Sequence, residues 1–274
     1  MRAKSPKLQP AILQGDCAEI LKDFPDDHFD LIITSPPYAD RRAHTYGGIK
    51  PEDYSDWFLW RSCQFMRVLK PTGTFVLNIK EQVDNGERHT YVLELILSLR
   101  KQGWLWTEEF IWHKSACMPG KWPNRFRDAW ERCLQFNKQR KFNMYQEAVM
   151  LPRSANFANR VNRVTDKEKV RRESGTKSGF GINVSNMVNL FKVYPTNVLY
   201  LSSESKNQKH SAAFPKALPD FFIKLFTKKG NLVLDPFVGS GTTCQVAQKL
   251  GRQSVGIDIL KENCELAIRK TTFV

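Results

Sequence analysis

The chain has 274 residues, of which 41% are hydrophobic, so it is long enough to form one large α/β domain or a core with an inserted module. No apolar run approaches the roughly 20 residues that a membrane-spanning helix needs, and residues 1–10 are polar, so we expect neither a membrane anchor nor secretion. The six cysteines include no C-x-x-C pair, which is typical of reduced thiols in a cytoplasmic protein and not of a metal site.

The net charge of +14 is concentrated in one part of the chain. Between Ser115 and Lys209 there are 18 Lys and Arg residues against 7 Asp and Glu residues, a net charge of +11. A general surface bias would be spread more evenly, so we expect this region to contact a polyanion. The alternative is a solvated insertion whose charge serves no partner.

Strands and helices alternate through the first half of the chain. Residues 11–15 predict a short strand that runs into Asp16 and a helical turn, and residues 29–34 form the continuous apolar run of a strand covered on both faces. Pro36 and Pro37 end that strand, because proline cannot continue a hydrogen-bonded ladder. The pattern then predicts helices and strands in turn, at residues 53–69, 74–79, 91–99 and 108–113.

The alternation stops in residues 139–194, which are rich in Arg, Asn, Ser and Gly and contain few long apolar runs. This composition predicts an inserted recognition module. The alternation returns with helices at 215–226 and 242–250 and strands at 231–235 and 254–257. The whole pattern predicts an α/β fold with a mostly parallel sheet and helices on both faces.

A glycine-rich turn, D-P-F-V-G-S-G from Asp235 to Gly241, follows a predicted strand and precedes a predicted helix. Glycines there let the backbone approach a ligand closely, and the helix N-terminus presents free N–H groups. The next strand ends at Asp258, where a carboxylate can accept hydrogen bonds from two ribose hydroxyls. Each feature also has a purely structural interpretation, a tight turn and a helix cap, but together they favour a nucleoside ligand.

The stretch Asp235–Thr243 resembles, over its full length, the motif D-P-F-x-G-S-G-T-T that binds S-adenosylmethionine in amino-group DNA methyltransferases. Ser35-Pro36-Pro37-Tyr38 resembles the other signature of that family, and the motif order, catalytic first and cofactor last, resembles its β arrangement. The resemblance implies a Rossmann-like methyltransferase fold with a mixed, mostly parallel seven-stranded sheet, circularly permuted, with an inserted target-recognition region. It divides the chain into a catalytic half-core, a target-recognition insertion and a cofactor-binding half-core, at residues 1–138, 139–209 and 210–274.

The resemblance also implies how S-adenosylmethionine is held. Asp258 would hold the ribose, and Asp16 resembles the acid that contacts the adenine amino group, although it is equally an ordinary helix N-cap. The segment that begins at His210 resembles the family's H-P-A-x-F-P, with Ser211 in place of the usual proline. The expected cofactor residues are Phe237, Gly239 and Gly241 on the methionine side, together with Asp16, His210, Phe214, Asp235, Ser240, Thr242 and Asp258.

The catalytic residues Ser35, Pro36, Pro37 and Tyr38 suit chemistry at an exocyclic base amine. Such an amine is a poor nucleophile, because its lone pair is delocalised into the ring, and acceptors for its N–H groups favour a pyramidal nitrogen. The Ser35 hydroxyl and the Pro36 carbonyl can accept these bonds, and Tyr38 offers a face on which an extruded base can stack. Methylation at cytosine C5 requires a cysteine nucleophile in a Pro-Cys pair, and the chain has none.

These features predict a sequence-specific DNA methyltransferase that modifies N4 of cytosine in duplex DNA after base flipping. In the family, serine at the first motif position accompanies mainly N4-cytosine methylation, and Asp or Asn mainly adenine N6 methylation, which is the close rival. Methylation of RNA or of a protein amide nitrogen is a second enzymatic possibility. A non-catalytic DNA-binding protein with the same fold is a possibility from a different class.

Double-stranded DNA is the expected partner, and neither a metal nor a membrane is expected. The resemblance implies a restriction-modification system in the cytoplasm of a bacterium or archaeon, acting at the nucleoid. A cognate restriction endonuclease would be encoded nearby, with no physical contact implied. Candidate DNA contacts, each individually more typical of phosphate binding or a solvated surface, are Arg41, Arg42, Arg160, Arg163, Arg171, Arg172 and Lys177.

Overall fold

The structure, a computed structural model, describes residues 10–39, 48–115, 117, 123–152, 192–202 and 214–272. The chain divides into two compact units, one of Met1–Tyr145 with Asn197–Val274 and one of Gln146–Thr196. The smaller unit lies within the stretch expected to recognise DNA, and that role stays a prediction. Its described elements are the short helix η3 (Gln146–Val149) and an antiparallel pair of strands, β8 (Leu151–Pro152) and β9 (Lys192–Val193).

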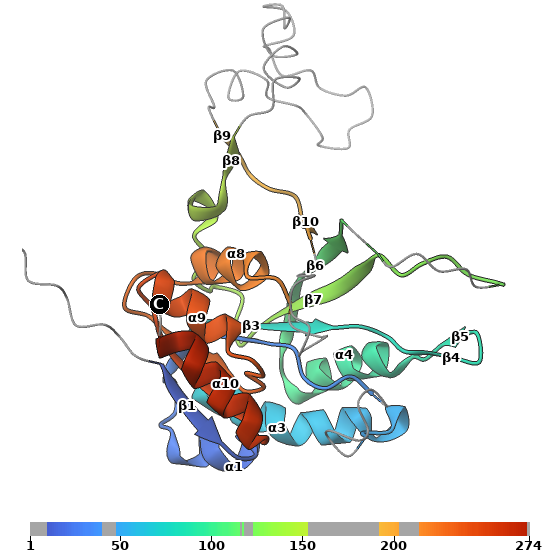
Figure 1. Cartoon of the computed structure of the whole chain (residues 1–274), viewed down its shortest axis with the longest axis horizontal. Helices are drawn as coiled ribbons and strands as arrows, with labels where there is room; N and C mark the ends of the chain where they lie inside the picture. The colour runs from blue at the N-terminus through green and yellow to red at the C-terminus, as the bar shows by residue number, and fades with distance from the viewer. Residues whose placement is uncertain are drawn as a thin grey trace, which may run out of the picture. The chain divides into compact units, whose positions relative to one another are not determined.

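The larger unit is built on one eight-stranded sheet (Figure 1). In spatial order its strands are β1 (Ala11–Gln14), β12 (Gln253–Asp258), β11 (Leu232–Asp235), β2 (Phe29–Thr34), β3 (Leu69–Ile79), β7 (Trp130–Asn137), β6 (Leu105–Lys114) and β10 (Val198–Leu201). Neighbouring strands are parallel except β7, which runs antiparallel to both β3 and β6. The mixed, mostly parallel α/β sheet is confirmed, with eight strands in place of the expected seven because β10 is added beside β6.

Predicted catalytic and cofactor-binding residues lie at one edge of this sheet. The carboxyl ends of β1, β12, β11, β2 and β3 coincide because these strands are parallel. β6 points the same way, and the antiparallel strand β7 brings its first residues to the same edge. Ser35, Asp235 and Asp258 each stand at or directly after the end of a strand and therefore meet there. In open α/β sheets, ligands bind at this edge.

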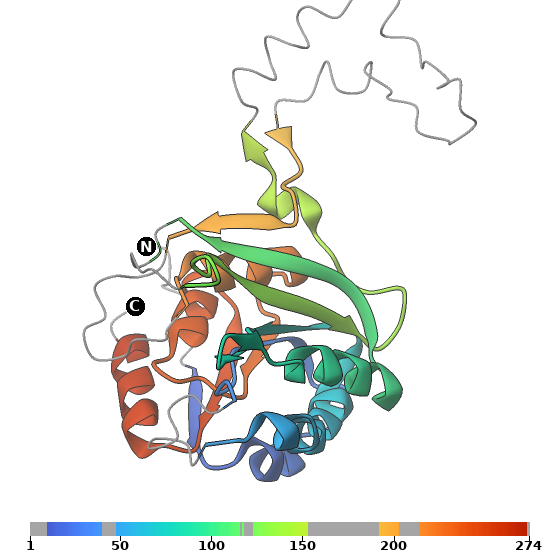
Figure 2. The ribbon, with the colours of Figure 1, turned by 90° about the vertical axis from the view of Figure 1, so that its right-hand side faces the viewer.

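Helices cover both faces of the sheet (Figure 2). One layer contains α1 (Cys17–Ile20), α3 (Tyr54–Val68) and α4 (Tyr91–Gln102), and the other contains α8 (Ala217–Phe226), α9 (Thr242–Lys249) and α10 (Lys261–Thr272). The remaining elements are the short helices η1 (Leu21–Asp23) and η2 (Pro51–Asp53) and the hairpin of β4 (Val83–Asp84) and β5 (Glu87–Arg88). None of the helices described is both long and apolar enough to span a bilayer.

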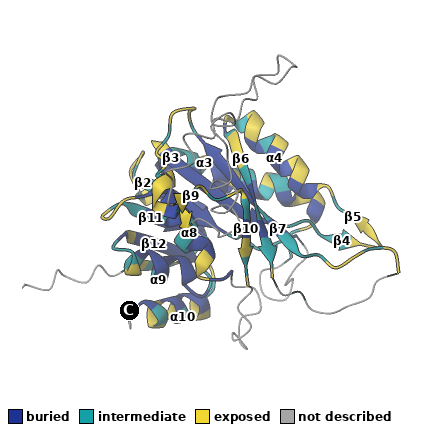
Figure 3. Ribbon diagram, turned by 90° about the horizontal axis from the view of Figure 1, so that it is seen from above, coloured by how far each residue is buried: buried dark blue, intermediate teal, exposed yellow. Residues whose placement is uncertain are grey.

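An aromatic core joins the sheet to the α3 layer. Phe75 of β3 is fully buried, and its ring centroid lies 6.3 Å from that of Phe58, 5.7 Å from Phe65 and 5.4 Å from Trp104. Figure 3 shows the central strands largely buried between the two helical layers, while the outer helix faces are exposed. Truncating a core phenylalanine to alanine typically costs about 3–5 kcal/mol. This core therefore holds β3, and with it Asn78 near the end of that strand, firmly in place.

Several elements of the structure differ from the sequence-based expectation. Strands β7 and β10 and helix α10 were not predicted, and β3 begins at Leu69, five residues before the expected start. The stretch Lys70–Gly73, expected as a break, lies inside β3 as a bulge. There the pairing with β2 jumps from Phe29–Leu69 to Leu31–Thr74. A proline and a glycine can be held within a strand at such a bulge, because those residues leave the hydrogen-bonded ladder.

Candidate active site

The predicted catalytic turn, Ser35–Tyr38, leaves the carboxyl end of β2. Pro36 is buried, and the fully buried Tyr54 of α3 donates a hydrogen bond to the Pro37 carbonyl at 2.9 Å. The turn is thus fixed by its strand on one side and by α3 on the other. Such rigid placement is what residues that orient a reacting group require.

Inside this turn, the Ser35 and Tyr38 hydroxyls form a chain of hydrogen bonds. Ser35 Oγ donates to Tyr38 Oη at 3.2 Å, and Tyr38 Oη in turn donates to Glu131 Oε2 at 2.8 Å. Burial, and then the Glu131 carboxylate, raise the pKa of Tyr38 well above its ordinary value, so the hydroxyl keeps its proton. The Tyr38 ring packs partly against the core. Its stacking on a flipped base stays a prediction.

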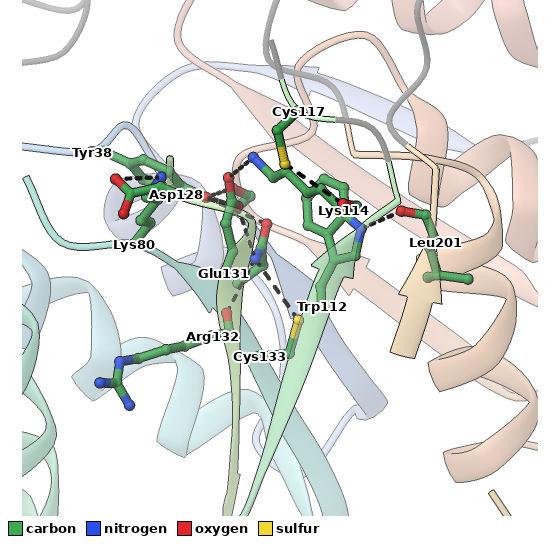
Figure 4. Close-up of polar contacts among 12 residues, drawn as sticks. Tyr38, Lys80, Trp112, Lys114, Cys117, Asp128, Glu131, Arg132, Cys133 and Leu201 are labelled. Carbon is green, nitrogen blue, oxygen red and sulfur yellow. Dashed lines mark hydrogen bonds and ion pairs between the residues drawn. The ribbon is translucent and has the colours of Figure 1, made fainter. Parts of the chain in front are cut away.

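Glu131 belongs to no sequence motif, and the sequence analysis missed it. It is the second residue of β7, only 7% exposed, and its Oε1 lies 2.5 Å from Lys114 Nζ at the end of β6 (Figure 4). Asn78 Nδ2 of β3 donates to Oε2 at 3.2 Å. The one signal in the sequence is a charged residue beside apolar ones, which points to buried polar chemistry only once β7 is known to be a strand.

Asp235, predicted to bind the cofactor, is held inside the protein. Its buried carboxylate accepts hydrogen bonds from the Thr34 hydroxyl at 2.7 Å, the Thr243 hydroxyl at 2.6 Å and the Phe237 N–H at 3.2 Å. Burial raises the pKa of Asp235 to about 6, although the three donors lower it. These bonds shape the cofactor loop and join it to β2, and a direct contact between Asp235 and the cofactor stays a prediction.

Two glycines of the loop have different neighbours. Both have positive φ, +48° at Gly239 and +82° at Gly241, a conformation that disfavours other residues. A Cβ at Gly241 would lie 2.7 Å from Ala267 Cα, so this glycine allows the loop to pack closely on α10. A Cβ at Gly239 would meet no atom closer than the Phe237 carbonyl oxygen at 4.0 Å. Gly239 therefore faces open space, as a backbone that approaches a ligand should.

Asp258 connects that loop to the next strand. Its Oδ2 accepts the Gly239 N–H at 3.0 Å and an Asn263 amide N–H at 3.1 Å, and its Oδ1 accepts the Leu260 N–H at 2.9 Å just before α10. The Leu260 bond stabilises the turn that leads into α10, and the Gly239 bond holds the glycine loop. The ribose contact stays a prediction.

Polar and aromatic side chains lie together beside the glycine loop. The Phe237 ring lies 5.7 Å from that of Trp57 of α3, and the Arg61 guanidinium lies 4.2 Å above the Trp57 ring. Arg61 Nη2 is 2.5 Å from Asp16 Oδ2, while Asp16 Oδ1 accepts the Ala18 N–H at 2.9 Å as the N-cap of α1. Trp57 and Arg61 were not predicted as site residues. In the sequence, a tryptophan at an apolar position of a helix indicates packing and not ligand binding, so Trp57 gave no signal for the site.

Most other predicted cofactor residues are buried nearby. Ser240 and Thr242 lie at the start of α9, with the Ser240 hydroxyl accepting a hydrogen bond from Lys270 Nζ at 2.7 Å, and Phe214 is buried. The part of the chain that the structure describes has no cluster of three His, Cys, Asp or Glu side chains able to hold a metal. Eight predicted residues lie outside the described residues: Arg41, Arg42, Arg160, Arg163, Arg171, Arg172, Lys177 and His210.

The chain is similar to known DNA methyltransferases. Residues 29–269 match a family model, N6_N4_Mtase, described as DNA methylase. The Type II methyltransferase M.PvuII of Proteus hauseri is 29% identical over 270 residues, which cover 90% of this chain and 79% of that protein.

Solved structures are also similar. That of PvuII DNA methyltransferase (cytosine-N4-specific) matches with a TM-score of 0.71 at 25% identity, over 96% of this chain and 88% of that chain. The fold of TTHA0409 from Thermus thermophilus, solved in complex with S-adenosyl-L-methionine, matches with a TM-score of 0.62 at 22% identity, over 96% and 94% of the two chains. Because the family match covers residues 29–269, which is most of the chain, the chain belongs to the N6/N4 DNA methylases, a family of DNA amino-methyltransferases.

Proposed function

We propose that this DNA methylase transfers a methyl group from S-adenosylmethionine to N4 of cytosine in duplex DNA, after the target base has left the helix. The Ser35 hydroxyl carries the proposal. Its proton is donated to Tyr38, so the Ser35 oxygen has only lone pairs left to offer and accepts a hydrogen bond from a substrate amine. Serine in this position accompanies mainly N4-cytosine methylation in the family, and the similar PvuII enzyme is described as cytosine-N4-specific.

The residues around the glycine loop fit S-adenosylmethionine. Gly239 leaves open space at the loop, and the rings of Phe237 and Trp57 form an aromatic surface that suits a sulfonium cation or an adenine ring. We assign Asp258 to the ribose and Asp16 to the adenine amino group, since both carboxylates stand at the carboxyl edge of the sheet, Asp258 as the last residue of β12 and Asp16 shortly after β1.

In the reaction, the protein acts mainly by positioning. When bound, S-adenosylmethionine would supply a methyl group activated by its sulfonium charge, and S-adenosylhomocysteine would leave with the electron pair of the carbon–sulfur bond. Ser35 Oγ and the Pro36 carbonyl accept the two N–H bonds of the amine, which keeps its lone pair directed at the methyl carbon. No covalent enzyme intermediate is needed, and the nitrogen releases one proton after the transfer.

DNA contact is supported near the same edge. Phe126 is 95% exposed and stands between Arg125 and Arg127. Asp128 follows Arg127, and its carboxylate lies 2.6 Å from the Arg88 guanidinium of β5, which holds this end of the segment in place. An exposed aromatic ring with an arginine on each side in the sequence suits base stacking together with phosphate contact. We assign Phe126 to DNA contact, and residues 139–209 with Arg41 and Arg42 to recognition.

Adenine N6 is the second candidate target. Its exocyclic amine has the same delocalised lone pair, and the same two acceptors serve it, so the described geometry suits either base. A non-catalytic DNA-binding protein ranks below both, because the catalytic turn and the cofactor loop are both intact. We place the reaction in a bacterial restriction-modification system in the cytoplasm, in keeping with the Type II methyltransferases that the chain is similar to.

The test is incubation of the purified protein with S-adenosylmethionine and unmethylated bacterial DNA, followed by nucleoside mass spectrometry. N4-methylcytosine supports the proposal, whereas N6-methyladenine supports the second candidate. No methylated nucleoside, with cofactor binding shown by calorimetry, would contradict both. Ser35→Ala should keep cofactor binding and lose most turnover, because it removes an acceptor and leaves the fold intact. Unchanged turnover would remove Ser35 from its assigned role.

A further inference from the structure

We infer that Glu131 is a positioning residue for methyl transfer: its carboxylate fixes the direction of the hydrogen bonds that run from Ser35 through Tyr38, so that the Ser35 oxygen faces the substrate amine as an acceptor. The inference rests on the proposed function and adds to it a residue outside both signature motifs. Figure 4 shows Glu131 between Tyr38 on one side and Lys114 on the other.

Glu131 is held by three strands. Its own strand β7 lies between β3, which supplies Asn78, and β6, which supplies Lys114. Asn78 Nδ2 also donates to the Arg132 carbonyl at 3.1 Å, so the amide is bound at two points of β7. A side chain only 7% exposed and tied to both neighbouring strands has little freedom. Its oxygen atoms are therefore fixed relative to the catalytic turn.

A carboxylate determines which way the Tyr38 proton points. Tyr38 Oη has one proton and two nearby acceptors, Glu131 Oε2 at 2.8 Å and Asn78 Oδ1 at 3.4 Å. An ionised carboxylate can only accept, and charge-assisted hydrogen bonds are the stronger kind. The Tyr38 proton therefore lies toward Glu131.

The direction is then passed to Ser35. With its own proton on the Glu131 side, Tyr38 Oη presents a lone pair, and Ser35 donates to it across 3.2 Å. Ser35 has no second proton, so every other hydrogen bond it makes must be as an acceptor. Without the Glu131 carboxylate, only the longer contact with Asn78 Oδ1 at 3.4 Å would hold the Tyr38 proton. The chain could then reverse, and Ser35 would point its proton at the amine that it has to bind.

Lys114 compensates the buried charge that this arrangement requires. A buried carboxylate without a partner is costly, and Lys114 Nζ at 2.5 Å supplies the opposite charge on the side away from Tyr38. The carboxylate thus satisfies three donors at once: Tyr38 and Asn78 on Oε2 and Lys114 on Oε1. An amide has one oxygen and cannot serve both sides.

A substitution series tests the inference. In single-turnover assays we expect Glu131→Gln to lower the methylation rate, and Glu131→Leu, which has no acceptor, to lower it further, by about 100-fold, the size of effect seen when one preorganised hydrogen bond is lost. Affinities for S-adenosylmethionine and duplex DNA should stay within about twofold of wild type, because Glu131 acts on orientation. Two variants are used so that the inference is still tested if one of them fails to fold.

A double-mutant cycle separates this role from a merely structural one. If Glu131 acts through the tyrosine hydroxyl, either Glu131 substitution should have almost no further effect in a Tyr38→Phe protein. An undiminished loss in that background would overturn the inference. Glu109→Gln is the matched control, since Glu109 lies on the adjacent strand β6, pairs with Arg132 and makes no contact with the Ser35–Tyr38 chain. It should leave the rate unchanged.

The outcomes also distinguish the two proposals. If the wild-type protein binds its cofactor and methylates no DNA, the proposed function is wrong. If wild type methylates and Glu131→Leu folds and does so at the wild-type rate, only the inference about Glu131 is wrong.

Discussion

The Thr34 hydroxyl donates a 2.7 Å hydrogen bond to the Asp235 carboxylate, between residues 201 positions apart in the chain. Thr34 is the last residue of β2, directly before Ser35, and Asp235 is the last residue of β11, directly before the glycine loop. The bond therefore fixes the spacing between the Ser35 turn and the glycine loop, which meet in the reaction that we propose. In-line transfer is sensitive to such spacing, because a shift of about 1 Å can cost about 100-fold in rate.

Thr34→Val is predicted to slow methyl transfer more than Thr243→Val does, although both substitutions should lower the stability by a similar amount. Valine keeps the shape and removes the donor, so the unfolding free energy should fall by about 1–3 kcal/mol, as for a buried group that loses its partner. Thr243→Val removes the other hydroxyl donor to Asp235, but from α9, away from Ser35. Chemical denaturation should show similar losses for both. Equal rates for the two variants in single-turnover assays would contradict a special role for Thr34.

Asp235 should make the stability depend on pH. Burial raises the pKa of Asp235 from 3.8 to about 6, so the folded protein favours the protonated form, and ionisation from about pH 4 to pH 6 costs stability. Asp235→Asn does not ionise. Relative to wild type, it should gain about 2 kcal/mol of unfolding free energy between pH 4 and pH 7, at 1.36 kcal/mol per pKa unit. Denaturant unfolding at both pH values measures this gain, and a constant difference would contradict it.

The central fold and both motifs could be predicted because their signals are local. An apolar run such as residues 29–34 has one strong interpretation, and β2 has those bounds in the structure. Parallel strands then bring the residues after them to one edge, which places Ser35 near Asp235. The repeated alternation of strands and helices was enough to predict the central parallel sheet.

The remaining site residues depend on antiparallel pairing that the sequence does not display. Strand β7, W-E-R-C-L-Q-F-N, buries Glu131 and Gln135 beside apolar residues, so its burial does not follow a simple alternation. Without β7, no pattern connects Glu131 with Lys114 or Tyr38. The hydrogen-bond partners of Asp235 are likewise set by tertiary contacts that the sequence does not display. The contact of Asp235 with the cofactor stays a prediction.

Gly239→Ala and Gly241→Ala should fail in different ways. Both place alanine at positive φ, which costs about 1–2 kcal/mol. At Gly241 the new methyl group would also collide with Ala267 of α10, so thermal unfolding should show the larger loss. At Gly239 the methyl group enters open space, and calorimetry should show S-adenosylmethionine binding weakened by tenfold or more. Undiminished cofactor affinity in Gly239→Ala would mean that the open space is not the cofactor site.

Phe126→Ala should weaken DNA binding without changing cofactor binding. The exposed ring contributes little to the fold, whereas a base stacked on an aromatic ring is worth about 1–3 kcal/mol. Fluorescence anisotropy with a labelled duplex of mixed sequence, at fixed salt, measures the loss. Trp106→Ala is the control, because Trp106 is also exposed but lies near the start of β6, at the opposite edge of the sheet. If both variants weaken binding equally, the loss is not specific to the catalytic edge, and Phe126 has no special place in DNA contact.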